Sequence, residues 1–173
     1  MTAADILAWH DFFAAVAGAG ATLAGLLFVG LTISLDNIVK ARGYLSRAFT
    51  ALFLQFEILL VGLVALVPGQ PGWVLGIEWI IAGVGVLTGI TVFRRNFPED
   101  ENSMVLSSRF PRIVRFTLTN TGTLLPAIAG VALFFDFKEA LYLVIPAIAA
   151  CIYLSIGYAW VFAVEIPRRS AGS

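Results

Sequence analysis

Five long apolar segments make up most of the sequence, at residues 12–35, 48–67, 73–93, 116–135 and 140–164. A helix needs about 20 apolar residues to cross the roughly 30 Å hydrocarbon layer of a bilayer, and each segment is long enough. Because lipid offers no partners for backbone N–H and C=O groups, such segments cross it as helices. We therefore predict an all-α polytopic membrane protein. Its bundle of five transmembrane helices would form a single transmembrane domain over residues 1–173, with no soluble domain.

The composition of the chain excludes several classes of protein. Hydrophobic residues make up 60% of the chain and charged residues 13%, and the mean hydropathy is +0.92. An average soluble domain has about 45–50% apolar and about 25% charged residues. The 11 basic and 11 acidic residues cancel, whereas binding to nucleic acid requires a dense basic surface. We predict the lipid bilayer as the surroundings of this chain and no nucleic-acid partner.

The basic residues are distributed unevenly among the connections between the apolar segments. In bacterial inner membranes Lys and Arg concentrate in the cytoplasmic connections. The pattern predicts a multi-pass protein of the bacterial inner (plasma) membrane, with the N-terminus outside, the C-terminus cytoplasmic and a cytoplasmic loop at residues 94–115. Only Lys138 then lies outside. The remaining basic residues lie inside: Lys40, Arg42, Arg47, Arg94, Arg95, Arg109, Arg112, Arg115, Arg168 and Arg169.

Five arginines of the predicted cytoplasmic loop and its flanks are expected to determine the topology and to contact anionic lipid headgroups. These residues are Arg94, Arg95, Arg109, Arg112 and Arg115.

The fourth apolar segment is the weakest of the five. Its first two turns carry five polar residues, namely Thr117, Thr119, Asn120, Thr121 and Thr123. A chain with four spans is therefore the alternative topology. Without the fourth span, however, Arg168 and Arg169 would lie outside, against the distribution of basic residues.

Glu57 is the strongest candidate for a functional side chain, because it lies at the midpoint of the second segment. A carboxylate at this depth costs several kcal/mol unless it is protonated, paired or hydrated. One hypothesis makes Glu57 a proton or cation site in a water-accessible cavity, and the other makes it an interhelical hydrogen bond. Pro126 lies at a similar depth and leaves the Gly122 carbonyl without its helical donor. A protonated Glu57 is a candidate for that donor.

Three further polar residues are assigned to the same hypothetical ion or proton pathway. Asn120 and Thr123 lie in the cytoplasmic half of the fourth segment, where they would either line an aqueous vestibule or bond to carbonyls of their own helix. Glu78 lies near the outer end of the third segment, as an outer-leaflet polar contact or as a cation-attracting ring in an oligomer. Trp73 and Trp79, on either side of it, are predicted to anchor the helix at the interface.

Small residues predict where helices approach each other in lipid. The first segment carries a stripe at spacings of four, three and four residues, consisting of Ala14, Gly18, Ala21 and Gly25. The third segment carries Gly85 and Gly89 as a Gly-x-x-x-Gly pair, and Gly76 and Gly83 lie on a neighbouring face. These stripes indicate either ordinary packing within one chain or an oligomer seam.

The chain lacks the usual motifs of catalysis and metal binding. It contains neither Gly-x-Ser-x-Gly nor His-Glu-x-x-His, and it has no Gly-rich phosphate loop. His10 lies at the external entrance of the first segment and Cys151 within the fifth, so the two do not converge on a metal. We predict no enzymatic activity, no cofactor and no metal.

Several short motifs occur in the first half of the chain: WHDFF at residues 9–13, Gly18, LAGLLFV at 23–29, VPGQ at 67–70 and GIE at 76–78. In these motifs the sequence resembles a family of small bacterial integral membrane proteins, some of whose relatives are labelled "modulator of FtsH protease". The motifs are turn and packing residues, so the resemblance implies the topology. This chain has five predicted spans where the best-known modulators have seven, and no functional residue is carried over.

Two functions remain open from the sequence. The first is a homo-oligomeric channel or permeation unit for ions or protons, since symmetric assembly would turn Glu57 or the polar fourth segment into a ring. The second is a non-conducting accessory or regulatory protein that binds another membrane protein or a protease. The expected partners are therefore the bilayer, further copies of the chain and, in the second case, another membrane protein.

Overall fold

The structure is a computed structural model, which describes residues 8–35, 38, 42–97 and 112–165. These residues form an all-α bundle without strands. The long helices are α2 (His10–Ile33), α4 (Arg42–Ala65), α5 (Gly72–Asn96) and α7 (Arg112–Phe134). A fifth unit combines the 3₁₀ helix η1 (Lys138–Leu143), the α-helix α8 (Val144–Trp160) and the π-helical turn η2 (Val161–Glu165).

Five helical segments are long and apolar enough to cross a membrane, so the prediction of an all-α bundle of five such helices is confirmed. The segment that the four-span alternative would drop, Ile113–Phe134, is one of the five. The helices extend beyond the apolar segments at their basic ends. Helix α4 begins at Arg42 and α7 at Arg112, ahead of the predicted starts at residues 48 and 116. Apolarity marks only the part inside hydrocarbon, whereas Arg is a good helix former that continues the helix into the headgroup region.

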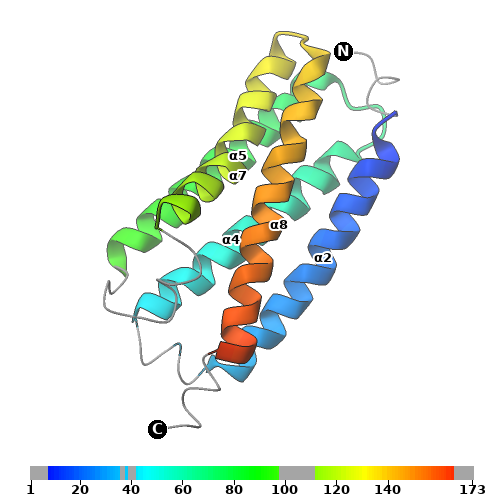
Figure 1. Cartoon of the computed structure of the whole chain (residues 1–173). Helices are drawn as coiled ribbons and strands as arrows, with labels where there is room; N and C mark the ends of the chain where they lie inside the picture. Colours follow the sequence, from blue (N-terminus) through cyan, green and yellow to red (C-terminus); the bar gives the residue numbers. More distant parts are fainter. Residues whose placement is uncertain (1–7, 36–37, 39–41, 98–111, 166–173) are drawn as a thin grey trace, which may run out of the picture.

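The five segments form a bundle in which each helix runs antiparallel to the next (Figure 1). Helices α2 and α8 lie in front, α5 and α7 lie side by side, and α4 crosses behind α8. The start of α2 and the end of η2 lie at opposite ends of the bundle, as an odd number of antiparallel segments requires (Figure 1). The core contains Leu54 and Ile58 of α4, Trp79 of α5, Leu133 of α7 and Leu154 of α8, all nearly inaccessible.

The sequence predicts one helical span at residues 140–164, but the structure divides this segment into a 3₁₀, an α-helical and a π-helical part. The 3₁₀ turn ends and α8 begins two residues before Pro146, which lacks an N–H and is tolerated in the first turn of an α-helix. At the other end the π-helical turn changes the backbone hydrogen-bond pattern. There the hydroxyl of Ser34, just after α2, donates to the Phe162 carbonyl and ties the two helices together.

Glycines allow α5 and α7 to pack closely. A Cβ atom added to Gly76 would lie 2.5 Å from the Gly130 carbonyl oxygen, and one added to Gly83 would lie 2.5 Å from the Thr123 carbonyl oxygen. Helices α2 and α4 meet in a similar way, since a Cβ on Gly62 would lie 3.1 Å from the Ala17 nitrogen. Small residues therefore form the seams inside this chain, as lipid-embedded helices require.

The predicted stripe of the first segment lies elsewhere. Ala14, Gly18, Ala21 and Gly25 all face outward, and no described residue lies within 4 Å of a Cβ added to Gly18 or Gly25. Packing within one chain is therefore the wrong interpretation of this stripe. The two glycines of the Gly-x-x-x-Gly pair of α5 have different surroundings. A Cβ on Gly89 would lie 2.9 Å from the Phe53 ring, whereas one on Gly85 would have no described residue within 4 Å.

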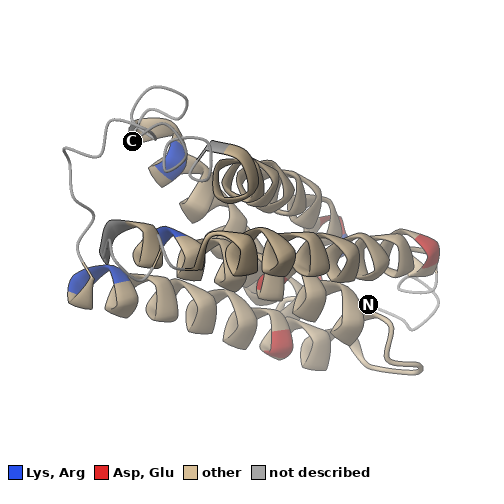
Figure 2. Ribbon diagram, turned by 90° about the horizontal axis from the view of Figure 1, so that it is seen from below, with Lys and Arg blue, Asp and Glu red and all other residues tan. Residues whose placement is uncertain are grey.

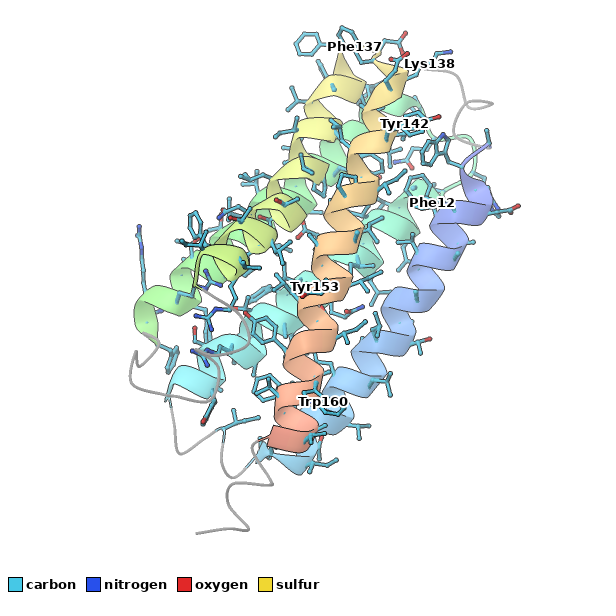
Figure 3. All side chains as sticks on the ribbon, in the orientation of Figure 1. Phe12, Phe137, Lys138, Tyr142, Tyr153 and Trp160 are labelled. Carbon is cyan, nitrogen blue, oxygen red and sulfur yellow. The ribbon has the colours of Figure 1, made fainter. Side chains whose placement is uncertain are left out.

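Basic residues gather at one end of the bundle, where α4 and α7 begin and α5 ends (Figure 2). We call this end the basic end and the opposite one the distal end. Lys138 lies at the distal end with Phe137, and Phe12 and Tyr142 lie close to it, while Trp160 lies toward the basic end (Figure 3). The Trp9 and Tyr142 rings meet edge to face with centroids 4.9 Å apart, which joins the start of α2 to η1.

The two tryptophans of α5 differ in position. Trp73 is 54% exposed, in keeping with the predicted interfacial anchor. Trp79 is fully buried, so its prediction as an anchor is wrong. Its indole Nε1 donates to the Val61 carbonyl at 3.3 Å, and its ring packs 5.9 Å from that of Phe13. A buried Trp needs such a polar partner, and Trp79 finds one on the neighbouring helix.

Candidate intramembrane site at Glu57

Glu57 lies on the buried face of α4. The positions 47, 50, 54, 57 and 61 follow spacings of three and four, which place them on one side of a helix, and all five are buried. The Glu57 side chain is 1% exposed. Among the described residues none donates a hydrogen bond to Oε1 or Oε2. Since a buried polar group without a partner costs about 1–3 kcal/mol, the carboxyl calls for a ligand, a proton or water.

Cys151 of α8 lies near this carboxyl and Gly122 of α7 lies against Cys151, each near the middle of its span. Cys151 is buried and lies close enough to Glu57 to interact with it electrostatically. A Cβ added to Gly122 would lie 2.5 Å from the Cys151 Sγ atom and 3.7 Å from Leu54, one turn from Glu57 on α4. Three helices therefore converge on the carboxyl at mid-membrane depth.

The predicted hydrogen bond from Glu57 to the Gly122 carbonyl is absent, because neither carboxyl oxygen has a partner among the described residues. Helix α7 continues through Pro126 regardless, since its packing against α5 and α8 holds it. Pro126 removes one donor from the helix, so the carbonyl of Gly122 lacks its usual N–H partner.

Buried polar side chains lie almost entirely between Glu57 and the basic end. In this half the structure buries Ser34, Ser46, Arg47, Thr50, Gln55, Thr119, Thr123 and Ser155. In the distal half the core is formed by apolar groups such as Val61, Leu75 and Val144. Among the described residues of this half, the buried polar side chain is that of Gln70 in the α4–α5 connection. The hydroxyls of Thr119 and Ser155, like Glu57, have no hydrogen-bond partner among the described residues. Polarity thus reaches from the basic end to mid-membrane and stops at Glu57.

The other predicted pathway residues of α7 are satisfied by their own helix. The Thr123 hydroxyl is fully buried and donates to the Thr119 carbonyl at 3.0 Å. The half-buried Asn120 donates through Nδ2 to the Phe116 carbonyl at 2.8 Å. This is the back-bonding that threonine and asparagine often show in membrane helices. The buried hydroxyl of Thr119, in contrast, has no partner among the described residues.

Glu78 does not belong to the Glu57 site. It lies beside Val64 in a lateral groove between α4 and α5, and Val64 is seven residues, or about 10 Å, from Glu57 along α4. Gln70 donates through Nε2 to the Glu78 Oε2 atom. The structure therefore separates the two carboxyl groups that the sequence had assigned to one pathway.

The structure describes four of the five arginines that were predicted to contact lipid headgroups. Arg94 and Arg95 occupy the last turn of α5, and Arg115 lies in the first turn of α7 at the same end. Arg95 is exposed, whereas Arg94 and Arg115 are half-buried. Arg112 begins α7, and Arg109 lies outside the described residues, as do Lys40, Arg168 and Arg169.

Sequence reasoning missed two residues near this site. The sequence indicates Arg47 only as a residue that determines topology, yet its side chain is 4% exposed and lies on the buried face of α4. Its spacing of three and seven from Thr50 and Leu54 was the signal for that burial. Gln55 is 1% exposed and donates through Nε2 to the Gly20 carbonyl of α2 at 2.6 Å. Two residues from Glu57, Gln55 points to the opposite side of α4, so α4 buries a polar side chain on each of two faces.

These features define a multi-pass, all-α membrane protein with a buried carboxyl at mid-membrane. Within the part of the chain that the structure describes, no group of three or more His, Cys, Asp and Glu residues is placed to hold a metal ion. Comparison with protein-family models finds no match, and comparisons with curated proteins and with solved structures find none either.

Proposed function

We propose that this protein is a permeation unit for protons or small cations, in which Glu57 is the binding group at mid-membrane. The observation that carries the proposal is the Glu57 carboxyl itself, 1% exposed and without a hydrogen-bond partner among the described residues. Intramembrane carboxyl groups are costly, and they mark proton relays and ion pathways in membrane proteins. A proton or a monovalent cation would supply what the carboxyl lacks.

The distribution of buried polar groups supports access from the basic end. Thr119, Ser155 and Thr50 lie between that end and Glu57, whereas apolar side chains fill the distal half. We place the basic end in the cytoplasm of a bacterium, because Lys and Arg concentrate on the cytoplasmic side of an inner membrane. The proposed unit is therefore open toward the cytoplasm and closed toward the outside, and transport requires the distal half to loosen.

The proposed pathway runs through each chain and not along an oligomer axis. Glu57 faces the interior of its own bundle, so packing several copies side by side would not bring their Glu57 side chains together. In this proposal the outward stripe of α2 serves assembly, because small residues let the helices of two copies approach closely.

The test is flux through purified protein in liposomes. We expect proton or monovalent-cation flux in the parent protein, and flux at the level of protein-free liposomes for Glu57→Gln, which keeps the shape of the side chain but cannot ionise. Glu139→Gln is the matched control, since it removes an exposed carboxyl from η1, and its flux should equal that of the parent. Equal flux in parent and Glu57→Gln, with both proteins folded, would refute the proposed role of Glu57.

A second candidate is a non-conducting accessory protein, and the outward stripe of α2 favours it. Among the described residues nothing lies within 4 Å of a Cβ added to Gly18 or Gly25, and such a face suits a helix of another membrane protein. The resemblance to labelled protease modulators is consistent with a partner of this kind.

Cross-linking distinguishes the two candidates. A photo-reactive side chain in place of Gly25 is expected to capture a second copy if the protein assembles with itself, and another membrane protein if it is an accessory subunit. The same side chain at Phe135, exposed at the distal end, is the control position and should capture neither. Capture of copies alone, together with Glu57-dependent flux, would exclude the accessory function.

A further inference from the structure

A lateral groove of about 460 Å³ runs between α4 and α5 and belongs to no pathway described above. Its volume falls within the range of small-molecule sites, which is about 300–1,000 Å³. The groove is lined by Phe53, Phe56, Leu60 and Val64 of α4 and by Ile81 and Gly85 of α5, with Glu78 at one end. Apart from Glu78 its lining is apolar, so the groove combines a hydrocarbon-like surface with one carboxyl group.

The groove is elongated along α4 and α5. From Phe53 to Val64 it spans 11 residues of α4, or about 16 Å at 1.5 Å per residue. Its distal end, at Val64 and Glu78, lies about 9 Å from the first residue of α5. Its inner end, at Phe53 and Gly85, lies near mid-membrane. An occupant would therefore hold its polar end near the distal headgroups and its apolar body inside the hydrocarbon layer.

Glu78 gives the groove a carboxyl group that no basic lining residue balances. Among the described residues its hydrogen-bond partner is Gln70, an uncharged amide that binds Oε2 and leaves Oε1 available. No charged residue accompanies Glu78 in the groove lining. A carboxylate beside hydrocarbon is costly without a cation, and a small inorganic cation does not enter hydrocarbon readily. The complementary ligand is therefore an organic cation that partitions into the bilayer.

A second groove offers an internal comparison. It has a volume of about 340 Å³, lies between α2 and α4, and is lined by Ala24, Phe49, Leu59 and neighbouring residues, with Gln55 but no charged side chain. The two grooves share Phe53 and Phe56. An ordinary lipid chain would fill either of them, so the carboxyl of Glu78 is what distinguishes the α4–α5 groove.

We propose that the α4–α5 groove binds a membrane-dissolved amphiphilic amine, with its ammonium group on Glu78 and its apolar chain along Phe56, Phe53 and Gly85. The ammonium group pairs with Oε1 while Gln70 holds Oε2 in place, and the absence of a side chain at Gly85 leaves room for the chain. The site is separate from Glu57 and does not depend on permeation.

The test is binding of radiolabelled dodecylamine to the protein in phosphatidylcholine nanodiscs, with dodecanol as the neutral competitor. We expect saturable binding to the parent and binding about tenfold weaker to Glu78→Gln, equivalent to about 1.4 kcal/mol. Gly85→Leu should weaken binding similarly by filling the groove, and it should fold, because nothing lies within 4 Å of an added Cβ at this position. Glu139→Gln and Glu57→Gln should bind like the parent.

Three results would overturn the proposal. The first is equal affinity in parent, Glu78→Gln and Gly85→Leu, which would place the amine elsewhere. The second is displacement of dodecylamine by dodecanol at equal concentration, which would reduce the groove to a lipid-chain surface. The third is loss of binding in Glu57→Gln but not in Glu78→Gln, which would assign the amine to the interior site. None of these results bears on flux, so this proposal and the permeation proposal fail separately.

Discussion

Replacement of Glu57 by Met is expected to raise the free energy of unfolding by about 1–3 kcal/mol while abolishing flux. The carboxyl is buried and finds no hydrogen-bond partner among the described residues, so its burial lowers the stability of the folded chain. Methionine has a similar length, no polar group and enough flexibility to fill the space beside Gly122 and Cys151. Replacement of an unsatisfied buried polar group by an apolar one of similar shape removes the desolvation cost of that group.

The measurement is unfolding in mixed micelles titrated with a denaturing detergent, followed by far-ultraviolet circular dichroism. Glu139→Gln is the control, because an exposed substitution should change stability by less than about 0.5 kcal/mol. Destabilisation by Glu57→Met would instead identify the carboxyl as a structural hydrogen-bonding group, which is the other hypothesis for this residue. Stabilisation with loss of flux would show that the carboxyl is kept for function at a cost in stability.

Gly83→Ala is expected to destabilise the bundle by about 1–3 kcal/mol, although alanine is the better helix former. A Cβ at this position would lie 2.5 Å from the Thr123 carbonyl oxygen and 3.1 Å from the Ala127 Cβ. These atoms belong to the backbone and to a short side chain of α7, neither of which can rotate away. Helices α5 and α7 would have to separate along the seam that Gly76 and Gly83 form.

Gly85→Ala, two residues away on the same helix, is the matched control. Nothing lies within 4 Å of an added Cβ at Gly85, so helix propensity alone acts and stability should rise by about 0.5–1 kcal/mol. Both variants are compared with the parent by the same detergent titration. Equal effects of the two substitutions would contradict the α5–α7 seam and favour Gly85 and Gly89 as the packing face.

Two side chains show what tertiary contacts add to a sequence pattern. Trp79 stands near the start of an apolar segment, where a tryptophan usually marks the interface, but the crossing of α4 and α5 buries it against the Val61 carbonyl and the Phe13 ring. Gln55 lies two residues from Glu57 and gave no separate signal, yet it bonds to the Gly20 carbonyl across the α2–α4 seam. In both cases the partner is a backbone carbonyl of another helix, which local sequence does not specify.

The sequence by itself determined the number of helices long and apolar enough to span a membrane, the gathering of basic residues at one end of the bundle, and the presence of a carboxyl at the middle of one helix. These follow from length, hydropathy and charge, which lipid enforces segment by segment. Only the tertiary structure decided that Gly76 and Gly83 pack inside the chain, that Gly18 and Gly25 face outward, and that Glu57 and Glu78 lie in separate sites. In lipid the interior and the exterior of a bundle are equally apolar, so hydrophobic periodicity does not reveal which face of a helix meets its neighbours.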